Sequence, residues 1–112
     1  MSFRKPRIHD PDHLAFVRSL LCLACLDNTS VEAAHIRFSD RRAAKINPGV
    51  GQKPHDYWTV PLCSECHRTQ HTMNEQDFWF NEQGIDPLAV AAWLYLASGD
   101  VEAGETIIRA QH

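Results

Sequence analysis

Four cysteines are the residues of this sequence best suited to chemistry, because they form two Cys-x2-Cys pairs. The pairs are Cys22 with Cys25 and Cys63 with Cys66. Two such knuckles supply four thiolates that can close a tetrahedron around zinc. Buried inert thiols or a redox motif are the alternatives, but neither knuckle resembles a redox active site. We predict a structural four-cysteine zinc site, or a variant of it in which a histidine replaces one cysteine.

Two histidines follow the second cysteine pair directly. His67 and His71 stand four residues apart, so on a helix their side chains project from the same face and can bind one cation together. An isolated pair of this kind would be read as two ordinary solvent-facing residues. Because this pair adjoins a cysteine knuckle, we predict that it binds a catalytic divalent metal, Mg²⁺ or another ion.

A third histidine and a carboxylate complete the candidate site. A neutral imidazole at His35 can take a proton from a water molecule that attacks phosphorus. Alone, such a histidine is more often structural. Together with Asp56 and the His67/His71 pair it forms a constellation in which one group makes the nucleophile. The others hold a metal that stabilises the transition state and the leaving oxygen.

Cationic residues are concentrated in the segment after His35. They are Arg37, Arg41, Arg42, Lys45 and Lys53, against the single acid Asp40. A solvated loop is the alternative reading, but a neighbouring active-site candidate favours contact with a phosphate backbone. No base-reading module is visible, so we expect low sequence specificity.

The elements that must position these residues can be predicted from capping and breaking residues. Asp10 and Pro11 are typical of a helix start, and the helix leads into the first knuckle. Residues 31–38 favour a strand, 39–54 a loop, and 57–60 a second strand halted by Pro61. Ser64 can cap a helix that runs from about Glu65 past His71.

The C-terminal half is predicted to be helical. One helix over 75–83 ends at Gly84, a second begins at Asp86-Pro87 and reaches Leu96, and a third ends near Ala110. Helical spacing favours core packing over base stacking for its large apolar residues. These residues are Phe78, Trp79, Phe80, Leu88, Val90, Trp93, Leu94 and Leu96.

Composition is consistent with one globular domain over residues 1–112. Hydrophobic residues make up 44% and charged residues 22%, with a net charge of −3. Residues 1–73 hold ten Lys and Arg against seven Asp and Glu, whereas residues 74–112 hold one against seven. No membrane span or signal peptide is apparent, and we expect a cytoplasmic protein with reduced thiols.

The cysteine and histidine motifs resemble the HNH, or ββα-metal, endonuclease pattern. The residues that carry the resemblance are both cysteine pairs, 33–37 (AAHIR), 53–56 (KPHD), 60–63 (VPLC) and the His67/His71 pair. They are similar to phage and prophage nucleases such as the RecA-dependent recombination-enhancement nuclease. The match covers about residues 20–73, roughly half of the chain, and its motifs are specific in combination.

The resemblance implies roles for individual residues. His35 would be the general base, His67 and His71 would bind the catalytic cation, and the four cysteines would hold structural zinc. Two positions depart from the pattern: Ala34 stands where many members have a metal-binding Asp or His, and Trp58 replaces the usual Asn. Asp56, or alternatively His55, would then orient the base or hold the metal.

We therefore expect an α+β fold, with a zinc-stabilised ββα-metal core over about 20–73 and a helical packing extension over 74–112. The expected activity is metal-dependent hydrolysis of nucleic-acid phosphodiester bonds, with DNA favoured. A recombination or replication protein is a possible partner in a phage or prophage setting. The alternative is a catalytically inactive zinc-binding module that contacts nucleic acid or protein.

Overall fold

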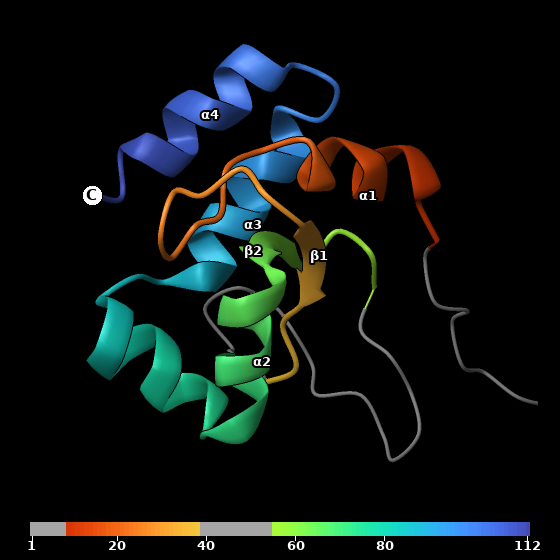
Figure 1. Cartoon of the computed structure of the whole chain (residues 1–112). Coiled ribbons are helices and arrows are strands. Elements are labelled where there is room, and N and C mark those ends of the chain that lie inside the picture. The colour runs from red at the N-terminus through yellow and green to blue at the C-terminus, as the bar shows by residue number, and fades with distance from the viewer. Residues whose placement is uncertain (1–8, 39–54) are drawn as a thin grey trace, which may run out of the picture.

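The computed structural model describes residues 9–38 and 55–112 (Figure 1). It has an α+β fold in which one helix comes first, two strands and a helix follow, and the remaining helices come last. The elements are α1 (Pro11–Arg18), β1 (Val31–His35), β2 (Thr59–Cys63), α2 (Ser64–Thr72), the π-helix η2 (Asp77–Gln83), α3 (Pro87–Leu96) and α4 (Val101–Arg109). The predicted loop over 39–54 lies outside the described residues.

The two strands form an antiparallel sheet at the centre of the molecule. Val31 pairs with Cys63 and His35 pairs with Thr59, so the second knuckle and His35 lie at opposite ends of the sheet. α1, α2 and α3 all contact the strands, and α4 packs against α3 (Figure 1). β1 is shorter than predicted and ends at His35, although the Ile36 amide still donates to the carbonyl of Trp58 at 2.9 Å.

Pro61 lies inside β2, so the prediction that it halts the strand is wrong. It pairs with Ala33, and its carbonyl accepts a hydrogen bond from the Leu23 amide at 2.8 Å. The backbone carbonyl of Pro61 therefore points away from β1. In an antiparallel pair every second residue faces outward in this way, so proline removes no bond between the strands.

Helix starts follow the predicted residues at α1 and shift by one residue at α2. The Asp10 carboxylate accepts from the His13 amide at 3.0 Å, and Pro11 is the first helical residue. At α2 the cap is Cys63, whose Sγ accepts from the Cys66 amide at 3.5 Å, so the prediction of Ser64 as cap is wrong. The sulfur can do this because the last strand residue turns directly into the helix.

The C-terminal helices match their predicted boundaries closely. Gly84 ends η2 in a left-handed conformation with φ 67°, which glycine adopts without steric cost. The Asp86 carboxylate accepts from the amides of Leu88 and Ala89 at the start of α3. α4 approaches α1 so closely at Gly104 that an added Cβ would lie 2.8 Å from Cζ of Phe16.

The core joins the sheet to the C-terminal half. Of the apolar residues predicted to pack there, Phe78, Trp79, Leu88, Val90 and Leu94 are buried. The prediction is wrong for three others, since Phe80, Trp93 and Leu96 are 41%, 49% and 86% exposed. A single helix buries one face against its neighbours, and these three residues project from the other side of their helices.

Leu94 and Leu96 form a matched pair for testing this core. Leu94 is 0% exposed, so Leu94→Ala is expected to lower the free energy of unfolding by about 2–5 kcal/mol. Leu96→Ala is expected to change it by no more than about 0.5 kcal/mol. Urea denaturation of the zinc-loaded protein measures both values. Equal losses in the two variants would show that α3 buries a different face.

Candidate metal centre and histidine site

All four cysteines converge at one point beside the end of the sheet. The four sulfur atoms all lie within 4.8 Å of one another, and they belong to Cys22, Cys25, Cys63 and Cys66. Within the part of the chain that the structure describes, this is the one group of three or more metal-ligating side chains that meets this distance. The predicted set of four cysteines is therefore brought together, without a histidine in place of any of them.

The spacing of the sulfur atoms fits zinc. Four sulfurs at about 2.3 Å from a tetrahedral ion are about 3.8 Å apart. Sγ of Cys25 and Sγ of Cys63 are separated by 3.8 Å, far beyond a covalent disulfide length, and all four thiols are unbonded. The soft donor set and closed geometry are typical of a structural zinc site.

A tight backbone turn shapes the first knuckle. The Cys22 amide donates to the carbonyl of Asp27, and the Leu26 amide donates to the carbonyl of Cys22, each at 2.8 Å. Leu26 has φ 65°, a left-handed conformation that a branched side chain adopts only where surrounding contacts hold it. The turn directs Cys22 inward, where it is buried, and leaves Cys25 exposed.

Burial and the neighbouring thiols govern protonation in this cluster. Burial, followed by hydrogen bonds to its sulfur neighbours, raises the pKa of the Cys66 thiol well above its ordinary value. Burial also raises the pKa of Cys25. Thiols of this kind hold their protons at neutral pH, so zinc binding must displace those protons.

His35 and Asp56 form the second part of the site. Nε2 of His35 lies 3.0 Å from Oδ1 of Asp56, which joins the end of β1 to the segment before β2. An ionised carboxylate only accepts hydrogen bonds, so this contact places a proton on Nε2 and the basic lone pair on Nδ1. The His35 side chain is 20% exposed, whereas that of Asp56 is 3% exposed.

Two further hydrogen bonds fix Asp56 in place, one to its carboxylate and one to its backbone carbonyl. Its Oδ2 accepts from the Asp10 amide at 2.8 Å, and its carbonyl accepts from Oγ1 of Thr59 at 2.8 Å. A buried carboxylate requires such partners. His55, the alternative partner for the base, instead stacks on Tyr57 at a ring separation of 5.1 Å. Of the two residues considered from sequence, Asp56 therefore contacts His35 through its side chain.

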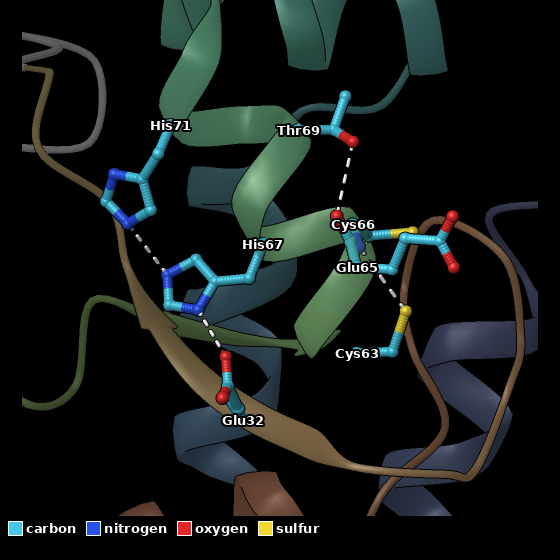
Figure 2. Close-up of polar contacts among 7 residues, drawn as sticks. All are labelled: Glu32, Cys63, Glu65, Cys66, His67, Thr69 and His71. Atoms are coloured by element: carbon cyan, nitrogen blue, oxygen red, sulfur yellow. Dashed lines mark hydrogen bonds and ion pairs between the residues drawn. The ribbon is translucent and has the colours of Figure 1, made fainter.

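The third part of the site lies on α2 (Figure 2). Nε2 of His71 is 3.1 Å from Nε2 of His67, as expected for residues one helical turn apart. Nδ1 of His67 lies 2.7 Å from Oε1 of Glu32. Figure 2 shows the imidazoles and Glu32 on one side of α2, and the sulfur atoms of Cys63 and Cys66 on the other.

Sequence reasoning missed Glu32. The signal that could have found it is strand alternation, because Glu32 shares a face of β1 with Ala34, the position where the nuclease pattern has its acidic or histidine ligand. His35 belongs to the other face and turns to Asp56. The described residues therefore include a contact between His35 and Asp56 and a contact between His67 and His71.

The two contacts lie along the same stretch of β1. At one end Glu32 meets His67, and beyond His35 a surface pocket is lined by Arg37 and Phe38 together with His71. Glu75 closes this pocket by accepting from the backbone amides of Arg37 and Phe38 at 2.9 and 3.0 Å. α2 thus runs beside the strand that carries His35.

Arg37 is the member of the predicted basic cluster that the structure describes. Arg37 is exposed, and it lines the surface pocket together with His71. The other four cations, Arg41, Arg42, Lys45 and Lys53, lie outside the described residues. In the same described part, no helix has the length and apolar character needed to cross a membrane.

Comparison with known proteins adds one family. A family model described as "Protein of unknown function (DUF968)" matches residues 2–98. No curated protein and no solved structure matches the chain significantly. The match covers both cysteine knuckles, all the histidines of the site and the whole of α3.

Removing one thiolate tests the metal centre. Cys25→Ser is expected to reduce bound zinc well below one ion per chain and to lower the unfolding midpoint strongly, because zinc binding in small modules is coupled to folding. Ser64→Ala, a neighbouring change outside the cluster, is the control and should keep the zinc. Zinc content and circular dichroism on heating are the measurements. A Cys25→Ser protein with full zinc and an unchanged midpoint would contradict the four-cysteine site.

Proposed function

Because the chain belongs to the DUF968 family, whose function is unknown, its activity must be argued from the site, and we propose a metal-dependent endonuclease of the HNH type. Its substrate would be a nucleic-acid phosphodiester, with DNA favoured. The observation that carries the proposal is the 3.0 Å contact between His35 and Asp56. A histidine oriented by a buried carboxylate is an arrangement that suits general base catalysis.

The role of His35 follows from this contact. Asp56 accepts the proton on Nε2, so Nδ1 is the atom that would take a proton from water. The negative charge of Asp56 also stabilises the imidazolium that results. Because Asp56 is itself held by the Asp10 amide, the ring orientation is set before substrate binds.

The imidazoles of α2 supply the second element of the proposal. His67 and His71 would hold a divalent cation, whose chemistry when bound is to offset negative charge on the phosphoryl group and the leaving oxygen. The four-cysteine cluster supports this role from the opposite side of α2. It would hold structural zinc and fix the helix from which both histidines project.

Substrate contact is assigned to the basic residues. Arg37 lies beside His71, where its guanidinium could meet a phosphate next to the one that is cut. Arg41, Arg42, Lys45 and Lys53 follow it in sequence and would extend the contact along the backbone. The acidic C-terminal half would face away from the duplex.

A zinc-binding module without catalysis is the second candidate. It is favoured by the finding that, among the described residues, the cysteines alone form a compact ligand group of three or more. In this reading the basic residues hold nucleic acid or a protein partner, and the histidines only stabilise the fold.

A cleavage assay separates the two candidates. Purified zinc-loaded protein is incubated with supercoiled plasmid and with single-stranded DNA in Mg²⁺, Mn²⁺, Ni²⁺ or chelator. The nuclease proposal expects metal-dependent nicking, reduced at least about 100-fold in His35→Ala, since general base catalysis contributes about 10²–10⁴-fold. Asp56→Asn is expected to be impaired too, because the neutral amide no longer stabilises the imidazolium.

Glu102→Ala is the control, since it changes an exposed side chain on α4 that is not part of the site. Equal cutting by the wild type and His35→Ala would exclude His35 as the base. DNA binding without cutting under any of the metals would favour the module.

A further inference from the structure

Glu32 stands out because its carboxylate makes a short contact that the proposed mechanism does not use. Its side chain is 51% exposed, yet Oε1 lies 2.7 Å from Nδ1 of His67. An exposed glutamate gains little from holding one rotamer in this way. The contact therefore calls for an explanation in terms of what it does to His67.

The contact determines which nitrogen of His67 carries the proton. An ionised carboxylate only accepts, so Nδ1 must donate and the ring lone pair lies on Nε2. In water the opposite tautomer of neutral histidine is preferred, and a hydrogen bond at one nitrogen is what sets the tautomer in a protein. Histidines that bind metals commonly donate their second N–H to a carboxylate in this manner.

The atom left with the lone pair points at His71. Nε2 of His67 and Nε2 of His71 are 3.1 Å apart. Two imidazole nitrogens at about 2.0–2.1 Å from one metal ion are about 2.9 Å apart at a right angle and about 3.3 Å apart at a tetrahedral angle. The observed separation falls between these values, so one ion fits both atoms.

The strand face explains why this carboxylate is Glu32. Ala34 lies on the same face and offers no ligand. Glu32, two residues before it in the strand, contacts His67 on α2. We propose that Glu32 is a positioning residue which holds His67 so that its Nε2 and Nε2 of His71 bind one divalent cation. This inference rests on the metal role that the proposed function gives to the two histidines.

The inference also selects the kind of cation. If Nδ1 of His67 engages Glu32, the ligands that the described residues offer at this site are two imidazoles, and the Glu32 carboxylate does not contact the ion directly. Imidazole suits first-row transition ions such as Zn²⁺ and Ni²⁺, whereas Mg²⁺ requires oxygen ligands. The site is therefore assigned to a transition metal ion and not to Mg²⁺.

Calorimetric titration with Ni²⁺ and Mg²⁺ tests both statements on protein whose cysteine site is already loaded with zinc. The wild type is expected to take one Ni²⁺ per chain and to bind Mg²⁺ far more weakly. Glu32→Ala should weaken Ni²⁺ binding about 10–100-fold, the usual effect of removing such a carboxylate. Glu32→Gln should recover part of this loss, because its amide oxygen still accepts from Nδ1.

Glu102→Ala is the control, since it removes the same charge from an exposed position on α4. Nitrogen-15 NMR of the imidazoles without Ni²⁺ gives an independent readout. His67 should carry its proton on Nδ1 in the wild type and in Glu32→Gln, and shift toward the Nε2–H form in Glu32→Ala. A merely structural role for Glu32 would not change the tautomer.

The outcomes separate this inference from the nuclease proposal. Ni²⁺ binding that depends on Glu32, in a protein that cuts no DNA, would support the metal site and overturn the nuclease. Equal Ni²⁺ affinity in the wild type and Glu32→Ala would overturn the role of Glu32, whatever the cleavage result. Wild-type protein that binds no second ion, or binds Mg²⁺ as tightly as Ni²⁺, would overturn the assigned site.

Discussion

The convergence of four thiols is the constraint on which the rest of this structure depends. It joins a turn that follows α1 to the junction between β2 and α2, across a sequence separation that a sheet of two strands could not hold alone. Cys63 has three roles here, since it is the last residue of β2, a member of the four-cysteine cluster and the cap of α2. Zinc at this point would therefore fix strand, turn and helix together.

Fixing the start of α2 determines where its other face lies. The sulfur atoms occupy one side of the helix, so His67 and His71 emerge on the other and run beside β1 (Figure 2). Glu32 then meets His67 and orients its ring. A metal ion held by the four cysteines would thus also fix the helix from which both imidazoles project.

At the opposite end of the sheet the organising group is a carboxylate. Asp56 is almost completely buried, and it accepts from the Asp10 amide as well as from His35. Desolvating a charge is costly, and these hydrogen bonds offset the cost. The same contacts tie the start of α1 to the sheet, so the orientation of His35 depends on the packing of α1 as well as on the sheet itself.

The sequence by itself determined the features that are set by local chemistry. Asp10 and Asp86 identify helix starts, Gly84 identifies an end, and the spacing of the cysteines identifies a metal ligand set, because capping, φ preference and ligand spacing act over a few residues. Pro61 shows the limit, since proline is excluded from a strand only where its missing N–H would face a partner, and that orientation is set by register.

Only the tertiary structure decided which side chains face which neighbour. The 3.0 Å contact selects Asp56 over His55, the exposure of Trp93 and Leu96 separates surface from core, and Glu32 joins the site although its local sequence shows no motif. Each of these outcomes depends on residues that are distant in the chain. A helix or strand has two faces, and its own sequence does not determine which other element covers each face.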